Sequence, residues 1–312
     1  MNSSRFAAIN NKFRVSNVFH RALAPAALTL ASICAGPAAH AQYIYVTDSG
    51  TNSILQISVV TGVKTTFASS LSNPRGIAVD AAGNVYEADS GSGTIFKFDK
   101  YGTKTTFKSG LGVGQMNGLA VDSTGVVYEA ESTANLIRKF TAAGVLSTTY
   151  NTLLNTPQGL AVDASDNLYE ADNGTGTIFK YTSLGSKSNY STANQVPGAY
   201  GMDVDSTGKL YVSETTGPIL KFTAANTAST FETGASVKGL AFDNSNNLYS
   251  VEGTTIVKAT TSAVRSTFSS GFTAPQFAAF SSVPEPGVTA LGTGTCAMVG
   301  MAFLRKKKTR KD

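Results

Sequence analysis

Short runs of alternating hydrophobic and polar residues, separated by turn residues, fill the middle of the chain. GIAVD (76–80) alternates and ends in a polar turn, and NVYEAD (84–89) alternates again before the Gly- and Ser-rich SGSGT (90–94). TIFKF (94–98) and KTTFKS (104–109) follow, rich in β-branched and aromatic residues. A period of two residues is typical of strands, whereas a helix would repeat every ~3.6 residues. The pattern therefore predicts four short strands joined by tight turns.

This four-strand pattern recurs along the chain in copies of about 40 residues. A tyrosine in the second strand marks each copy: Tyr45, Tyr86, Tyr128, Tyr169, Tyr211 and Tyr249. The tyrosines are 41, 42, 41, 42 and 38 residues apart, so six copies are present. Four short antiparallel strands in ~40 residues are the size of one β-propeller blade. We therefore expect one blade per copy.

The first and last copies are incomplete in complementary ways. The first begins at its second strand, in residues 43–48, with no first strand before it. After the sixth copy, PQFAAF in residues 275–280 has the spacing of a first strand. We predict that 275–280 pairs with the N-terminal blade and closes the ring. The predicted fold class is all-β, a six-bladed β-propeller of four-stranded blades over residues 42–282.

The formal net charge of +5 lies at the two ends of the chain. Residues 1–41 hold four basic residues and no acid, and the last 27 residues hold six basic residues and one acid. Residues 42–285 have 15 basic against 19 acidic residues, so the middle is mildly acidic. A nucleic-acid-binding core would carry the opposite charge, so no nucleic-acid partner is expected.

The central region also lacks the side chains that many catalytic sites use. Both cysteines (Cys34, Cys296) and both histidines (His20, His40) lie outside residues 42–282. The predicted propeller therefore has no disulfide, no thiol or imidazole group for catalysis, and no Cys/His zinc site.

The N-terminal 41 residues have the order of features of a secretory signal peptide. A basic region precedes an apolar stretch over residues 22–35, and Ala39 and Ala41 form a small-x-small pattern before Gln42. We predict a signal peptide over residues 1–41, cleaved after this pattern. The alternative, a buried helix of a folded domain, is disfavoured because prolines interrupt the apolar stretch.

The C-terminal residues 283–312 combine three features in a fixed order. Val283, Pro284, Glu285 and Pro286 are followed by an uncharged segment over residues 287–304 and then by a basic end, RKKKTRK. The 18-residue segment is slightly shorter than the ~20 residues that span a bilayer. Basic residues after such a segment stay on the cytoplasmic side, so the propeller would lie outside.

This arrangement resembles the PEP-CTERM sorting tail of Gram-negative bacteria, whose VPEP motif matches residues 283–286. The resemblance implies processing by an exosortase and an association with extracellular polysaccharide. It also implies export through the inner membrane to the cell surface or extracellular matrix, with transient or permanent anchoring through residues 287–304. An ordinary single-span anchor is the alternative.

The repeat unit GIAVDAAGNVYEAD (76–89), followed by TIFKF, is similar to the NHL repeat and related propellers. The resemblance covers almost all of residues 42–281. Such propellers include protein-binding platforms, and related six-bladed propellers include lactonases and lyases. The resemblance therefore implies a fold and leaves the activity open.

Carboxylates are the only candidates for site chemistry in the repeats. Glu87, Glu129 and Glu170 occupy equivalent places in three consecutive copies, where an NHL repeat more often has an apolar residue. Six further acids end the same strands: Asp48, Asp89, Glu131, Asp172, Glu214 and Glu252. The three glutamates are metal-ligand candidates, for calcium or another divalent cation in the channel.

A structural role is the favoured alternative for these acids. The strand-end acids would cap loops, and the three glutamates would pair with lysines of the third strand, namely Lys97, Lys139 and Lys180. No catalytic or cofactor-binding residue is assigned, and no cofactor is expected unless the cation binds.

These observations favour an exported, non-enzymatic binding or scaffold propeller with an extracellular glycan or protein as its ligand. Loops on a rigid ring suit such recognition. The predicted partners also include an exosortase-type processing enzyme. The alternative is a metal-dependent lactonase-like or lyase-like hydrolase that uses channel carboxylates.

Overall fold

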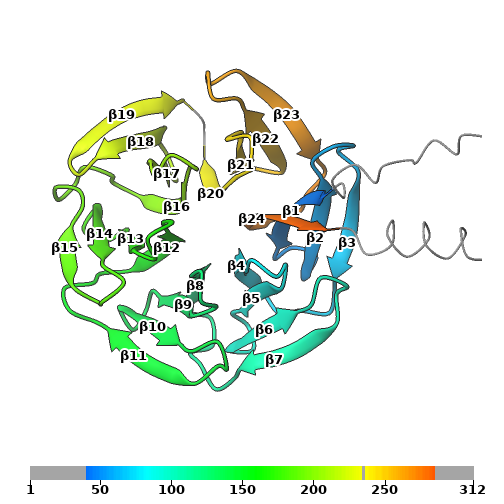
Figure 1. The fold of residues 1–312 in the computed structure, drawn as a ribbon, viewed down its shortest axis with the longest axis horizontal. Helices are drawn as coiled ribbons and strands as arrows, with labels where there is room; N and C mark the ends of the chain where they lie inside the picture. Colours follow the sequence, from blue (N-terminus) through cyan, green and yellow to red (C-terminus); the bar gives the residue numbers. More distant parts are fainter. Residues whose placement is uncertain (1–39, 234–235, 285–312) are drawn as a thin grey trace, which may run out of the picture. The chain divides into compact units, whose positions relative to one another are not determined.

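The computed structural model describes residues 40–233 and 236–284, and this part of the chain contains β-strands and no helices. Its 24 strands form six four-stranded antiparallel sheets. Figure 1 shows these sheets arranged as blades around a central axis. The prediction of an all-β, six-bladed propeller is therefore confirmed. Within the described ranges, no helix is long and apolar enough to cross a membrane.

The strands occupy four positions in each blade, from the axis outward. The inner strands are β24 (Pro275–Pro284), β4 (Pro74–Val79), β8 (Met116–Val121), β12 (Pro157–Val162), β16 (Ala199–Val204) and β20 (Val237–Phe242). The second strands are β1 (His40–Asp48), β5 (Val85–Asp89), β9 (Val127–Glu131), β13 (Leu168–Asp172), β17 (Leu210–Glu214) and β21 (Leu248–Glu252). The third strands are β2 (Ser53–Ser58), β6 (Thr94–Phe98), β10 (Leu136–Phe140), β14 (Thr177–Tyr181), β18 (Ile219–Ala224) and β22 (Thr255–Ala259). The outer strands are β3 (Lys64–Ala68), β7 (Lys104–Lys108), β11 (Leu146–Tyr150), β15 (Lys187–Asn189), β19 (Thr227–Glu232) and β23 (Arg265–Ser270).

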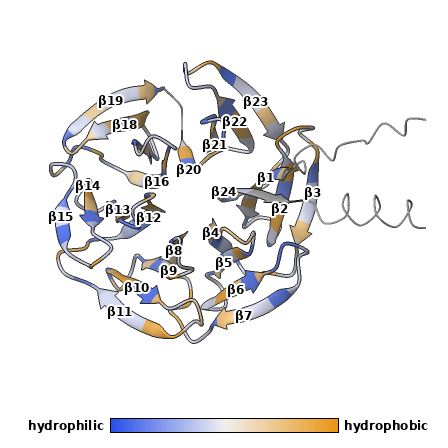
Figure 2. Ribbon diagram, viewed as in Figure 1, coloured by the Kyte–Doolittle hydropathy of each residue, from blue (hydrophilic) through white to orange (hydrophobic). Residues whose placement is uncertain are grey.

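We number the blades 1 to 6 along the chain, so that blade 1 contains β24, β1, β2 and β3 and blade 6 contains β20 to β23. Six clusters of buried hydrophobic residues fill the six interfaces between neighbouring blades. In one of them, Tyr169 and Ile178 of blade 4 pack against Met202 and Phe222 of blade 5. The hydrophobic core is thus divided among the blade interfaces. The outer strands carry hydrophilic stretches (Figure 2) because most of their residues face solvent.

Glycines set the spacing of the inner strands around the axis. Five inner strands each contain one at the same position, and we call Gly76, Gly118, Gly159, Gly201 and Gly239 the ring glycines. A Cβ atom at any of them would collide with the backbone of the inner strand of the next blade. Neighbouring inner strands therefore approach closely only because the side chain is absent.

The ring closes in blade 1, as predicted. Strand β24 pairs antiparallel with β1, with Tyr45 opposite Ala279 and Ile44 opposite Phe280. The pairing continues beyond the predicted closing strand, to Val283 opposite Ala41.

The predicted domain boundaries at residues 41/42 and 282/283 fall within these two paired strands. Val283 and Pro284 of the predicted sorting motif lie in β24. Glu285, Pro286 and Ala39, together with the segments 1–39 and 285–312, lie outside the described residues. The signal peptide and the sorting tail therefore stay predictions.

Candidate functional site

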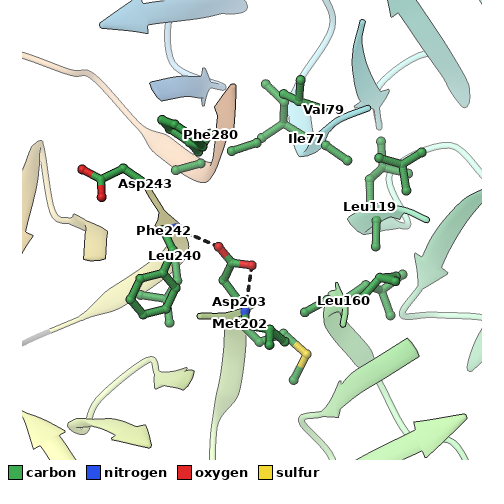
Figure 3. A pocket seen from close by; sticks show the side chains of 18 of the residues that line it. Ile77, Val79, Leu119, Leu160, Met202, Asp203, Leu240, Phe242, Asp243 and Phe280 are labelled. Carbon is green, nitrogen blue, oxygen red and sulfur yellow. Dashed lines mark hydrogen bonds between the residues drawn. The ribbon is translucent and has the colours of Figure 1, made fainter. Parts of the chain in front are cut away.

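The propeller axis contains a cavity of about 520 Å³, and we call it the axial cavity. Its wall is formed by the residues that follow the ring glycines on the inner strands. Most are aliphatic, among them Ile77, Leu119, Leu160 and Leu240 (Figure 3). An apolar pocket with a few polar groups is the usual form of a small-molecule site.

Two carboxylates, Asp203 and Asp243, interrupt this mostly aliphatic wall. Asp203 on β16 stands where all five other inner strands have alanine: Ala78, Ala120, Ala161, Ala241 and Ala279. Its carboxylate accepts hydrogen bonds from two backbone N–H groups, those of Phe242 and Val204, both at 2.8 Å. Figure 3 shows the carboxylate between Met202, Phe242 and the centre of the cavity. The fold therefore holds Asp203 in one orientation at the cavity wall.

The surroundings of Asp203 change its acidity. Burial raises the pKa of its carboxyl to about 6, although the two backbone hydrogen bonds favour the charged form. The neighbouring Asp205 carboxylate adds to the increase in pKa. Asp203 is therefore a group that exchanges its proton near neutral pH and can meet a cation, donate or accept a hydrogen bond, or transfer a proton.

Aromatic rings lie on the same side of the axial cavity as Asp203. Phe242 and Phe280 occupy positions where blades 2 to 5 have valine, and both contribute to the wall. The second cavity carboxylate, Asp243, already accepts hydrogen bonds from the Asn247 backbone N–H and from the Tyr249 hydroxyl. Asp203 is thus the carboxylate that the wall presents to a ligand.

Asp203 is not among the site residues predicted from the sequence, because those residues recur at equivalent positions in several copies. Its signal is a departure from the repeat: the fifth inner strand reads GMDVD where its neighbours read GLAVD and GLAFD. A charged residue at a position that is otherwise alanine would have indicated a site.

The metal-ligand candidates Glu87, Glu129 and Glu170 lie away from the axial cavity. All three are fully buried on the second strands, and none lines the cavity wall. They belong to separate blades and are not brought together. Among residues 40–233 and 236–284, no group of three or more His, Cys, Asp or Glu residues could hold a metal ion. The described residues therefore do not bring together the carboxylates that the predicted calcium site would need.

The expected pairing of these glutamates with third-strand lysines is wrong. In the β5–β6 ladder Tyr86 lies opposite Lys97, while Glu87 lies opposite Phe96. Because strand side chains alternate between faces, the lysine shares the face of the tyrosine. Lys97 lies over the Tyr86 ring at 5.0 Å from its centroid. Lys139 and Lys180 stack in the same way on Tyr128 and Tyr169.

The three glutamates have different partners. Glu129 accepts a hydrogen bond from Arg138 at 2.9 Å, whereas both carboxylate oxygens of Glu87 and Glu170 are buried without a hydrogen-bond partner. Burial raises the pKa of all three carboxyls, that of Glu129 to about 7 against the opposing Arg138 charge. Burial thus favours the neutral form of Glu87 and Glu170.

The expected loop-capping role holds for three of the strand-end acids. Asp48 accepts backbone hydrogen bonds from four residues of two loops. Asp89 accepts from the Ser72 and Ser92 N–H groups, and Asp172 accepts from Asn155 and Thr175. Glu131 and Glu252 instead pair with arginines.

Solved structures of several functions share this fold. A chain of the nidogen/laminin complex matches with a TM-score of 0.68 at 16% identity, covering 77% of this chain and 98% of that chain. A streptogramin B lyase matches with a TM-score of 0.62 at 15% identity, covering 78% and 87%. A gluconolactonase from Xanthomonas campestris matches with a TM-score of 0.59 at 16% identity, covering 78% and 90%. No protein-family model and no curated protein matches the sequence.

These neighbours correct one expectation from the sequence. The chain was expected not to be an enzyme, and that expectation is wrong as stated because its structural neighbours include lyases and a gluconolactonase. At 15–16% identity the likeness shows the fold alone. The resemblance to NHL-type propellers is confirmed at that level: the chain is a six-bladed β-propeller.

Proposed function

We propose that this propeller binds a small, largely apolar molecule in the axial cavity and that Asp203 contacts a cationic or hydrogen-bond-donating group of the ligand. The observation that carries the proposal is the Asp203 carboxylate in a mostly aliphatic wall whose other carboxylate, Asp243, is bonded to Asn247 and Tyr249. Phe242 and Phe280 line the same cavity, and aromatic faces attract cations. A ligand with a hydrophobic body and an amine fits this combination.

A pair of matched probes tests this proposal. 1-Naphthylmethylamine carries an ammonium group, and 1-naphthalenemethanol has the same rings with a neutral hydroxyl. We expect the amine to bind more tightly than the alcohol, and its affinity to rise as the pH increases through about 6, because Asp203 then becomes charged. Titration calorimetry at several pH values measures both effects.

Two variants link the result to Asp203. Asp203→Ala introduces the residue that the five other inner strands have at this position, so the blade should still form, and it should weaken amine binding about tenfold or more. Asp203→Asn should remove the pH dependence. Asp166→Asn, which removes a half-buried loop carboxylate that does not line the cavity, is the matched control and should bind as the unmodified protein does. Equal binding of amine and alcohol, or full binding by Asp203→Ala, would overturn the proposal.

A second candidate is hydrolytic or lyase chemistry in the same cavity. It is favoured by the pKa of Asp203, since a carboxyl that titrates near 6 is suited to proton transfer at neutral pH. Lyases and a gluconolactonase also use this fold. Turnover of gluconolactone that Asp203→Ala abolishes would support this chemistry, and turnover unchanged in that variant would refute it.

The destination of the chain is a separate proposal from the sequence. We propose that it is exported, that an exosortase-type enzyme processes the tail, and that residues 287–304 contact the membrane. A glycan or protein of the extracellular matrix would then bind on the outer surface, where the loops of the rigid ring lie. Mass spectrometry of the exported protein tests the processing: a C-terminus near Val283 supports it, and an intact basic end contradicts it.

A further inference from the structure

The residue before the ring-glycine position contributes one side chain from each blade. We call these six residues the axial ring: Arg75, Asn117, Gln158, Tyr200, Lys238 and Gln276. They precede the ring glycines on the inner strands, whereas the wall of the axial cavity follows the glycines. The axial ring therefore lies at the end of the axis opposite Asp203.

Contacts between blades show that these side chains converge. The Arg75 guanidinium donates to Asn117 Oδ1 at 2.7 Å, which joins blades 2 and 3. Lys238 Nζ and the Tyr200 hydroxyl donate to Gln276 Oε1 at 3.2 and 3.3 Å. Tyr200 belongs to blade 5 and Gln276 to blade 1, so this contact passes over the inner strand of blade 6.

An aromatic pair lies at the level of the ring glycines. Phe277 stands where the other blades have a ring glycine, and its ring stacks on Tyr200 with centroids 5.2 Å apart. Phe277 is buried, so its stacking on Tyr200 fixes the position of that axial-ring residue.

The charge of the axial ring is uncompensated. It contains two cations, Arg75 and Lys238, and no carboxylate. Neither cation takes part in any of the ion pairs found in the described part of the chain. Burial lowers the pKa of Lys238, and the nearby Arg75 charge lowers it further. Two half-buried positive charges close enough to interact are costly without an anion between them.

Most acids of the nearest ring are already occupied; Glu214, opposite Ala199 and next to Tyr200, takes part in none of the ion pairs of the described residues. The strand-end acids of the second strands pair in register with residues next to the axial ring, as Asp89 does with Pro74. The carboxylates of Asp48 and Asp89 already accept backbone N–H groups of the loops. Glu131 and Glu252 are paired with Arg138 and Arg265.

Two polar atoms of the axial ring are buried and lack a partner. They are Arg75 Nε, a hydrogen-bond donor, and the side-chain oxygen of Gln158. Rotation of the Gln158 amide exchanges its oxygen for an NH₂ group, which makes it a second donor. The axial ring then contains three hydrogen-bond donors that a ligand could use: Arg75 Nε, the Gln158 amide and the Lys238 ammonium.

We propose that the axial ring is a binding site for a small oxyanion, a carboxylate or phosphate group, held by Arg75 and Lys238 with Gln158 as an additional donor. Arginine suits this role because its planar guanidinium matches the two oxygens of such a group. The site is independent of Asp203 and of the ligand proposed for the axial cavity.

The test uses D-glucuronate, inorganic phosphate and neutral D-glucose as probes. We expect saturable binding of at least one anion, none of glucose, and a shift of the Arg75 Nε–H signal in ¹H–¹⁵N NMR spectra on binding. Binding of glucuronate alone assigns the site to carboxylates, and binding of phosphate alone assigns it to phosphate groups. Asp203→Ala should leave this binding unchanged, which separates the two proposals.

Single variants identify the residues responsible. Arg75→Gln and Lys238→Gln should each weaken anion binding about tenfold or more, as loss of a charged hydrogen bond does. Lys108→Gln removes the same charge from outer strand β7 and should have no such effect. Circular dichroism shows whether each variant is folded, and Lys238→Gln decides the result if Arg75→Gln does not fold. Absence of saturable binding, or equal weakening by Lys108→Gln, overturns the proposal.

Discussion

Individual buried acids in this propeller make its stability depend on pH. Glu170 is fully buried between Tyr181, Asp172 and Lys187, and its oxygens have no hydrogen-bond partner. Burial raises its pKa, the Asp172 charge adds to that rise, and the Lys187 charge opposes it. The folded protein therefore holds a proton that the unfolded chain releases above its ordinary pKa of 4.5.

Glu170→Gln should stabilise the protein at alkaline pH. A raised pKa means that the favourable contribution of Glu170 is present below about pH 4.5 and is lost as the pH rises through its folded-state pKa. The variant cannot ionise, so at about pH 8 we expect its free energy of unfolding to exceed that of the unmodified protein. Near pH 4 the two should agree.

Urea unfolding between about pH 4 and pH 8 measures this difference. Asp166→Asn, which removes a half-buried loop carboxylate that accepts hydrogen bonds from Ser123, is the control for loss of a charge and should not gain stability toward alkaline pH. A constant difference between Glu170→Gln and the unmodified protein across this range would show that Glu170 is ionised in the folded state.

At the scale of the strand, the inner strands depend on their ring glycines. A Cβ atom at Gly159 would lie much closer to the carbonyl oxygen of Tyr200 in the next blade than a van der Waals contact allows. The obstacle is backbone, so no side-chain rotation relieves it. Neighbouring blades would have to move apart and lose part of the packing between Tyr169 and Met202.

Gly159→Ala should therefore destabilise the protein by about 2 to 4 kcal/mol. Gly110→Ala is a suitable comparison because Gly110 has a φ of 77° and no atom within 4 Å of an added Cβ. That change adds only backbone strain, about 1 to 2 kcal/mol. Thermal unfolding of the two variants measures the costs, and equal losses would show that the inner strands tolerate wider spacing.

At the scale of the whole molecule, the ring is closed by residues far apart in the sequence. Strand β24 completes blade 1, and Thr47 of β1 donates a side-chain hydrogen bond to the backbone of Arg75 in blade 2. Ala278 of β24 packs with Ile256 and Phe272 in the interface between blades 1 and 6. Closure removes the two free edges that an open ring would present.

Truncation tests the contribution of this closure. Removal of residues 275–312 leaves blade 1 with three strands and exposes the β1 edge, so we expect the Tm to fall by more than about 10 °C. Removal of residues 285–312 keeps all of β24 and is the matched control, expected to keep the Tm of the full chain. Similar Tm values for the two truncated proteins would show that the ring is stable without its closing strand.

The architecture could be predicted from the sequence because each blade is a local unit. Four strands lie within about 40 residues, and their pairing follows chain order in blades 2 to 6. The closing pair is long-range, yet the missing first strand and the spare last strand identified it. Period, turn residues and copy number therefore determined the number of blades, the strands in each blade and the place where the ring closes.

Tertiary structure alone decided which side chains meet. Glu87 was expected to meet Lys97, but strand alternation and register place them on opposite faces of the sheet. The three glutamates looked like a channel site because they recur, yet they lie between blades, whereas the cavity presents Asp203. The residues of the axial ring are about 40 positions apart in the sequence, and contacts such as Arg75 with Asn117 and Tyr200 with Gln276 form only where the inner strands surround the axis. A repeat specifies what each blade has in common, and the site depends on what differs between blades once all six surround one axis.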